Sequence, residues 1–506
     1  MESLKGHDSR FIWLQGSPGT GKTAIAKSIA DSLAQNNRLA ASFFWDKTGN
    51  RANANSIELF PSSLARQLAR FSQDYEMLLV NLLLDRSFRN ILMRPLQAQM
   101  DSLLIQPMSS LSQAFSSGEG CPVIVLDGLD ECGSRDALED LMKVVVLLDK
   151  LPPDFMILVS ARPELEIHGI FKPFRNVHCL YTDKISKDDT NHTITLLVQR
   201  GLEEIRQQRH SNWVPTEDDL RAFVETCRQL PVLAEVRVRE VRISASRGAT
   251  LRNAFYNVKH DGSLSGDLND DYLRILRRAY RRGDVHSASH STEAAISTTP
   301  SNGLAVSPDV LYNYRAVVGT VIAAQRRLSV RTISTILAIS EEEVRAVLDP
   351  IGSIINVPTD HDPVHFYHAT AKEFLTDPPR GDENDRAFFF TDVEGAFLAL
   401  PLLKILNENL NRDILKTYHG GKEIPEHITY GAVHWSTHLD LSSASEELWG
   451  DLHLFLTTKL FLWGELIMYP DPPRLGMESR EECTHDYALG AVRKQKEVSK
   501  APETIA

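Results

Sequence analysis

Cysteine is scarce in this sequence: there are five among 506 residues, and no two are spaced as C-x-x-C. A disulfide framework or a structural zinc site needs an even number of cysteines or closely spaced pairs of them. The sequence therefore predicts neither, and it favours a reducing compartment.

Long apolar runs are also lacking. No stretch reaches the roughly 18 apolar residues that mark a membrane-spanning helix, and the most apolar late segment, 454–469, is interrupted by Lys459 and Glu465. The first expected strand begins at Phe11, which leaves no room for a signal peptide before it. We therefore expect a cytoplasmic protein without a membrane partner.

Basic residues are fewer than acidic ones: there are 55 lysines and arginines and 67 aspartates and glutamates, which gives a net charge of −12. Proteins that bind nucleic acid broadly carry a basic surface, so this balance argues against that class. An apolar content of 42% is typical of a globular protein, and the chain is long enough for several domains.

What the sequence does contain is the phosphate-loop pattern G-x-x-x-x-G-K-[ST] at 16–23, between an apolar strand expected at 11–14 and an amphipathic helix. Glycines let the backbone wrap around a phosphate, and the amide N–H groups and the helix N-terminus then face the anion. We predict that Lys22 reaches the β- and γ-phosphates and that the Thr23 hydroxyl binds Mg²⁺. The alternative is a glycine-rich turn that fits the pattern by chance. The predicted nucleotide-binding residues of this loop are Gly16, Ser17, Pro18, Gly19, Thr20, Gly21, Lys22 and Thr23.

A second motif is an apolar strand at 122–127 that ends in a carboxylate, Asp127, and is followed by Asp130 and Glu131. Ligands of open α/β sheets bind at the carboxyl ends of the strands, so Asp127 is predicted to hold Mg²⁺ beside Thr23. Asp130 or Glu131 would orient or deprotonate the attacking water. The alternative is an acidic loop without a catalytic role. The long separation of Lys22 from Asp127 requires a sizeable insertion if their strands are neighbours.

Arg162 follows the next expected strand, 155–160. A guanidinium at this edge is predicted to bind the γ-phosphate through charge-assisted hydrogen bonds, and a surface ion pair is the alternative.

The chain order predicts several domains. Short apolar runs alternate with helical patterns over 1–175, which predicts an α/β domain with a parallel sheet covered by helices. Its remaining expected elements are a strand at 41–45 and a helix at 60–71. The segment 185–282 is predicted to be a helical domain, although 236–242 alternates valine with charged residues like a half-exposed strand. Its expected helices are 193–207, 217–230 and 270–282, the last with a basic, solvated face.

Residues 283–309 are rich in small polar residues, which predicts a flexible linker. Helices at 330–338 and 341–348, followed by strands around 354–357 and 364–367, predict a winged helix over 310–380. The segment 386–469 predicts a second helical domain, and 470–506 a polar, disordered tail.

These motifs together resemble the NACHT domain of signal-transducing P-loop ATPases, a class that includes animal innate-immune receptors and fungal heterokaryon-incompatibility proteins. The fungal group is the most similar, through Phe43-Phe44-Trp45 and Leu129-Asp130-Glu131-Cys132. The resemblance implies a nucleotide domain, a helical domain, a winged helix and a second helical domain. It also implies an effector domain before this region and repeats after it, so the sequence looks truncated at both ends.

A winged-helix histidine of this family contacts the diphosphate and holds the closed, ADP-bound state, in a motif resembling His-x-Ser-Phe-x-x-Phe-Leu. His368 and Phe374-Leu375 match that motif, whereas Thr370-Ala371 replace its Ser-Phe. The resemblance thus implies that His368 binds nucleotide, while a structural histidine is the alternative. Residues 228–260 depart from the apolar, small-residue helix of the family, and a gene-model error is one explanation.

Three functions are compatible with these patterns. The expected one is a signalling switch that binds ATP and ADP, hydrolyses ATP slowly with Mg²⁺ and oligomerises with itself or with a full-length NACHT-type partner. A nucleotide-binding scaffold or decoy without turnover is the second. A winged-helix regulator that binds nucleic acid is the third, and it is favoured only by a basic cluster. That cluster consists of Arg274, Arg277, Arg278, Arg281 and Arg282.

Overall fold

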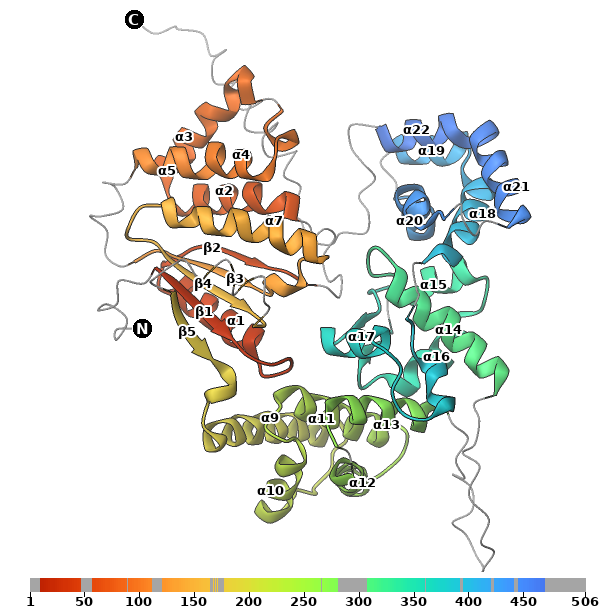
Figure 1. The fold of residues 1–506 in the computed structure, drawn as a ribbon. Helices are drawn as coiled ribbons and strands as arrows, with labels where there is room; N and C mark the ends of the chain where they lie inside the picture. Colours follow the sequence, from red (N-terminus) through yellow and green to blue (C-terminus); the bar gives the residue numbers. More distant parts are fainter. Residues whose placement is uncertain are drawn as a thin grey trace, which may run out of the picture. The chain divides into compact units, whose positions relative to one another are not determined.

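The computed structural model divides the chain into two compact units: Met1–Ile333 with Ile339–Val393, and Ser334–Ala338 with Glu394–Ala506 (Figure 1). The structure describes residues 10–46, 57–88, 90–111, 121–163, 167, 169, 171, 177–264, 266–280, 307–359, 361–391, 395–419, 423–440 and 445–468. The predicted tail lies outside these ranges, and so does the predicted linker except for 307–309.

The first unit begins with a five-stranded sheet of order β2-β3-β4-β1-β5, in which every neighbouring pair is parallel. Its strands are β1 (Phe11–Gln15), β2 (Leu39–Phe44), β3 (Val123–Asp127), β4 (Met156–Ala161) and β5 (Val177–Tyr181). The predicted parallel α/β domain and its four expected strands are confirmed. The edge strand β5 was not predicted: it is short, His178 interrupts its apolar residues, and none of its residues is fully buried.

Helices cover both faces of this sheet. Side chains alternate along a strand, so Ile12 and Leu14 pack on α1 (Lys22–Gln35), whereas Phe11 and Trp13 belong to the core of the other face. Strands β1 and β3 are buried along their whole length, as expected where both faces are covered. Figure 1 shows the second face under the helices that precede and follow β3.

A helical insertion separates β2 from β3 and accounts for the long distance in sequence between Lys22 and Asp127. It contains α2 (Phe60–Phe71), α3 (Gln73–Leu84), α4 (Leu96–Met100), a π-helical turn at Asp101–Ile105 and α5 (Gln106–Ser110). Helix α7 (Arg135–Val145) then leads toward β4, which lies between β3 and β1. The strands that carry the two motifs are therefore not neighbours.

The segment after β5 is helical, with α9 (Lys187–Gln208), α10 (Glu217–Thr226), α11 (Pro231–Ser246), α12 (Leu251–Leu264) and α13 (Leu268–Tyr280). The strand expected at 236–242 is wrong, because these residues lie within α11. Their alternation misled because Arg237 and Glu240 are buried on this helix as fully as the valines. Arg237 forms an ion pair with Asp271 at 2.8 Å, and Glu240 accepts from Arg274 at 2.7 Å.

The arginines of α13 also differ from the basic face that the sequence predicted. Arg274 and Arg278 bind the buried carboxylate of Glu240, and Arg277 lies 2.6 Å from the buried carboxylate of Asp385. These arginines are therefore ion-paired within the first unit, although Arg277 and Arg278 remain 41% and 47% exposed to solvent, as a solvated face requires. Arg281 and Arg282 lie outside the described residues.

The three helices and two strands predicted for the winged helix follow in order. They are α14 (Pro308–Ala323), α15 (Val330–Leu337), α16 (Glu341–Leu348), β6 (Ile355–Asn356) and β7 (His365–Phe366). Helix α17 (Ala369–Thr376), which follows them, was not predicted. The strands β6 and β7 form an antiparallel pair. Ser340 and Glu343 make a reciprocal capping box that begins α16.

The second unit is helical, as predicted. Its helices are α18 (Ala399–Asn409), α19 (Arg412–His419), α20 (Glu426–His434), α21 (Glu446–Leu454) and α22 (Leu460–Met468). Leu402, Leu406 and Phe455 are buried in it. Among all the helices described, none is long and apolar enough to span a membrane. The exact domain boundaries stay a prediction.

Candidate nucleotide-binding site

The phosphate loop connects β1 to α1, and its glycines are required by its conformation. Gly19 and Gly21 have φ angles of 78° and 92°, in the left-handed region that favours glycine. A Cβ atom on Gly19 would also lie 2.4 Å from the side chain of Val232 on α11. Only glycine fits these positions without a shift of the surrounding chain.

Lys22, the first residue of α1, folds back over the loop. Its Nζ donates to the carbonyl oxygens of Gly16 and Ser17 at 2.7 and 3.0 Å. Burial lowers the pKa of Lys22, whereas the nearby carboxylates of Asp130, Asp127 and Asp183 raise it. These contacts hold the ammonium group at the mouth of the loop.

Asp127 ends β3 at the carboxyl edge of the sheet and is 1% exposed. Burial raises its pKa, and the hydroxyls of Ser160 and Thr23 lower it, so Thr23 lies beside this carboxylate. The Oδ1 atom of Asp127 is buried without a hydrogen-bond partner. A buried carboxylate oxygen beside a threonine hydroxyl fits a Mg²⁺ ion.

The described residues contain no cluster of three or more His, Cys, Asp or Glu side chains arranged to bind a metal. A magnesium ion that bridges a nucleotide does not need such a cluster, because phosphate oxygens and water supply most of its ligands. Thr23 and Asp127 would therefore be the residues that contribute to such a site.

Arg162 lies between two carboxylates. Its Nε is 3.0 Å from Asp130, which also accepts from the Arg162 backbone N–H at 3.1 Å. Its Nη2 donates to both carboxylate oxygens of Glu373 on α17, each at 2.8 Å. Burial would lower the pKa of Arg162, but Glu373, Asp130 and Glu131 outweigh it and raise that pKa. In this structure, then, the guanidinium of Arg162 forms ion pairs with carboxylates. The alternative prediction was also an ion pair, but one at the surface, whereas Arg162 is mostly buried.

Glu131 lies in the short 3-10 turn Leu129–Glu131 with Asp130, directly after β3. The left-handed Gly128 precedes this turn, and the Glu131 N–H donates to its carbonyl at 2.7 Å. Both predicted acidic residues are therefore at the edge of the sheet that carries Asp127 and Lys22.

His368 caps the N-terminus of α17. Its Nδ1 accepts from the Thr370 backbone N–H at 3.2 Å, so the neutral ring carries its proton on Nε2. Burial lowers the pKa of His368. The carboxylate of Glu235 raises that pKa, whereas the positive charges of Arg162 and Lys22 lower it. The structure thus binds Nδ1 of His368 to α17 and leaves the other ring nitrogen as a donor.

Sequence reasoning missed the residues that hold the loop and Arg162 from outside the recognised motifs. Thr182 and Asp183 follow β5 and contact the loop, Val232 packs on Gly19, and Glu373 binds Arg162. The rule that sites gather at the carboxyl ends of parallel strands would have indicated Thr182 and Asp183 if β5 had been recognised.

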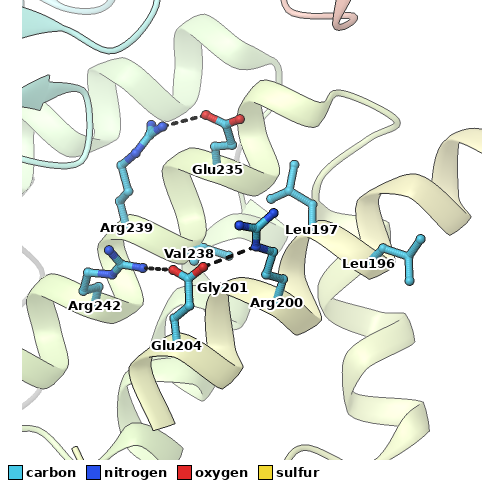
Figure 2. Close-up of a pocket in the computed structure, with 9 residues that line it drawn as sticks. All are labelled: Leu196, Leu197, Arg200, Gly201, Glu204, Glu235, Val238, Arg239 and Arg242. Carbon is cyan, nitrogen blue, oxygen red and sulfur yellow. Dashed lines mark hydrogen bonds and ion pairs between the residues drawn. The ribbon is translucent and has the colours of Figure 1, made fainter. Parts of the chain in front are cut away.

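A separate groove of about 450 Å³ lies between α9 and α11 (Figure 2). It is lined by Leu196, Leu197, Arg200, Gly201, Glu204, Glu235, Val238, Arg239 and Arg242. Arg200 and Arg242 pair with Glu204, and Arg239 pairs with Glu235. All five charged side chains of the groove are therefore ion-paired, with three arginines against two glutamates, and the groove contains none of the predicted site residues.

The loop, the acidic end of β3 and the parallel sheet define a P-loop nucleotide-binding domain. Residues 2–162 match the family model described as Nephrocystin 3, N-terminal. The chain is also 20% identical over 515 aligned residues to the vegetative incompatibility protein HET-E-1 of Podospora anserina, with 91% of this chain and 33% of that protein covered. The chain thus spans about a third of the length of this relative. These matches confirm the NACHT-like P-loop character predicted from the motifs.

Among solved structures, the Walker-type ATPase PABY2304 of Pyrococcus abyssi is similar at 15% identity. The similarity covers 74% of this chain and 93% of that one, with a TM-score of 0.32.

Proposed function

We propose that this protein is a nucleotide-dependent signalling switch that is closed with ADP and opened by ATP. The observation that carries the proposal is the position of Arg162, which joins Asp130 of the nucleotide-binding domain to Glu373 of the winged helix. One guanidinium thus connects the end of β3 to α17. A γ-phosphate in the loop would compete with Glu373 for the same cation.

A second ion pair joins the same two parts of the first unit. Arg327, between α14 and α15, lies 3.4 Å from Asp46, which follows β2. Its side chain is only 6% exposed, and burial lowers the pKa of Arg327 to about 10 although Asp46 raises it. Charge-assisted contacts contribute about 1.5–3 kcal/mol each, and a complete switch requires about 5.5 kcal/mol. Both pairs stabilise the closed arrangement, so ATP would open it only if the contacts that ATP gains in the open state exceed what these pairs contribute.

ADP would favour this closed arrangement through His368. The ring can donate from Nε2 to a diphosphate oxygen while Nδ1 remains bound to Thr370. Lys22 and the loop amides would bind the β-phosphate in both states. A nucleotide changes the balance between two states only through contacts that differ between them, and here those contacts involve Arg162 and His368.

Hydrolysis is expected to be slow in the closed arrangement. Mg²⁺ held by Thr23 and Asp127 would neutralise charge that develops on the phosphates. Asp130 and Glu131 are the proposed residues for orienting or deprotonating water, but Asp130 is already bound twice by Arg162. Asp130 would become available after Arg162 moves to the γ-phosphate.

The test is the molar mass in solution of the purified protein loaded with ADP or with ATP, together with the nucleotide that copurifies. A switch predicts bound ADP and a monomer as purified, and larger assemblies with ATP and Mg²⁺. A mass that is the same with either nucleotide would contradict the switch.

A nucleotide-binding scaffold without turnover is the second candidate. The engagement of Asp130 by Arg162 favours it, because the proposed water-orienting group is occupied. Phosphate release separates the two functions: the scaffold predicts tight ADP retention and no phosphate, whereas the switch predicts slow but measurable release. The basic cluster no longer favours the nucleic-acid function, because Arg274, Arg277 and Arg278 bind carboxylates.

A further inference from the structure

The turn that follows β5 holds the first residues of the phosphate loop. Thr182 is 6% exposed, and its Oγ1 lies 2.7 Å from the Thr20 hydroxyl and 3.3 Å from the Gln15 carbonyl oxygen. A Cβ atom on Gly16 would come within 1.8 Å of the same Oγ1. The Thr182 hydroxyl therefore occupies the space that the glycine leaves open.

Asp183 binds the next residue of the loop. Its Oδ2 accepts from the Ser17 backbone N–H at 3.0 Å. The carbonyl oxygen of Ser17 accepts from Lys22 Nζ at 3.0 Å, and the carbonyl oxygen of Gly16 accepts from the same atom at 2.7 Å. The backbone that Asp183 fixes is therefore the backbone that orients the ammonium group.

We propose that Thr182 and Asp183 are positioning residues of the nucleotide site, an inference that rests on the proposed binding of nucleotide. Thr182 fixes the loop through Thr20 and Gln15. Asp183 acts through Ser17, whose carbonyl holds Lys22 at the mouth of the loop. Neither residue needs to touch the nucleotide for this role.

The same turn connects the loop to the helical segment. The 3-10 turn Thr182–Lys184 leads to Ser186, which caps the N-terminus of α9. On the opposite side, the Val232 N–H of α11 donates to the Gly19 carbonyl at 3.4 Å, and the Val232 side chain packs on Gly19. The loop is thus held by residues next to α9 and on α11. A displacement of these helices would change the loop geometry, and with it the affinity for nucleotide.

The test measures ADP and ATP affinity of the full chain by calorimetry in paired variants. Thr182→Val keeps the shape of the side chain but removes the hydroxyl, and we expect a roughly tenfold weaker affinity. Thr182→Ser restores the hydroxyl and should bind as the wild type does. Thr226→Val is the matched control, because Thr226 is a buried threonine whose hydroxyl donates to Phe223 within α10, outside the site.

For Asp183, the two variants separate the accepting oxygen from side-chain loss. Asp183→Ala removes the acceptor for Ser17 and should weaken binding about tenfold, whereas Asp183→Asn keeps an amide oxygen and should recover most of it. Thermal unfolding without nucleotide shows whether a variant is folded. Folded Thr182→Val and Asp183→Ala that bind as the wild type does would overturn the positioning role. A wild type that binds no nucleotide would instead overturn the proposed function.

Discussion

At the residue scale, the site combines a contiguous motif with side chains that the fold brings to it. The loop residues could be predicted because their geometry depends on eight neighbouring positions, 16–23, and on the following helix. Asp127 could be predicted because an apolar strand precedes it. Glu373 and Asp183 could not, because their roles depend on α17 and on a short edge strand that His178 interrupts.

Lys22→Ala tests the loop itself. We expect it to abolish nucleotide binding measured by calorimetry, because the ammonium group supplies the only side-chain positive charge within the loop motif. Lys27→Ala is the control, since Lys27 is an exposed lysine on the same helix. If Lys22→Ala binds ATP as the wild type does, the site is elsewhere.

Asp127→Asn tests the magnesium site through two measurements that change in opposite directions. Burial raises the pKa of Asp127 above its ordinary value, so its ionised form costs stability at neutral pH, and that cost decreases as the pH falls through the raised pKa. The variant should therefore unfold at the same or a higher temperature than the wild type without nucleotide. It should also lose most of the increase in ATP affinity that Mg²⁺ provides, by roughly tenfold or more.

An unchanged effect of Mg²⁺ would contradict the metal-binding role of Asp127. A lower unfolding temperature would contradict the expected cost of its buried charge. In the wild type, the Mg²⁺-dependent part of the affinity should weaken as the pH is lowered, since the metal binds the ionised carboxylate.

At the element scale, apolar strands and amphipathic helices were predictable, whereas α11 was not. Two of its charged residues, Arg237 and Glu240, are buried because partners on other elements neutralise them, and no local pattern encodes such partners. The valines of 236–242 alternate with Arg237, Arg239 and Glu240, which imitates a strand with one exposed face. Long-range ion pairing therefore overrides the pattern in α11, just as incomplete burial hides β5.

Asp271→Ala tests the buried ion pair of this helical segment. Removal of the carboxylate leaves the fully buried Arg237 without its charge partner, which should reduce the free energy of unfolding by about 3–5 kcal/mol. Asp218→Ala is the control, because its pair with Arg221 is exposed to solvent and should cost no more than about 1 kcal/mol. Similar losses in both variants, measured by denaturant unfolding, would contradict the structural importance of the buried pair.

At the scale of the whole molecule, the order of the domains was predictable from composition and motifs, but their contacts were not. The sequence indicated an arginine at the nucleotide edge and a histidine in the winged helix. The structure adds the carboxylate that Arg162 binds, and this contact gives the proposed switch a physical basis. The second pair, Arg327 with Asp46, joins the same two parts of the first unit and would stabilise the proposed closed arrangement.

The most direct test of this account is the rate at which preloaded, fluorescently labelled ADP leaves the full-length chain in Glu373→Gln. The variant keeps the size of the side chain but removes the charge that holds Arg162. We expect ADP to leave roughly 10–100-fold faster than from the wild type, because one charge-assisted contact of the closed state is lost. Glu225→Gln, a change at an exposed position of α10, should release ADP at the wild-type rate. A Glu373→Gln protein that releases ADP no faster than this control would contradict the claim that Arg162 and Glu373 hold the closed state.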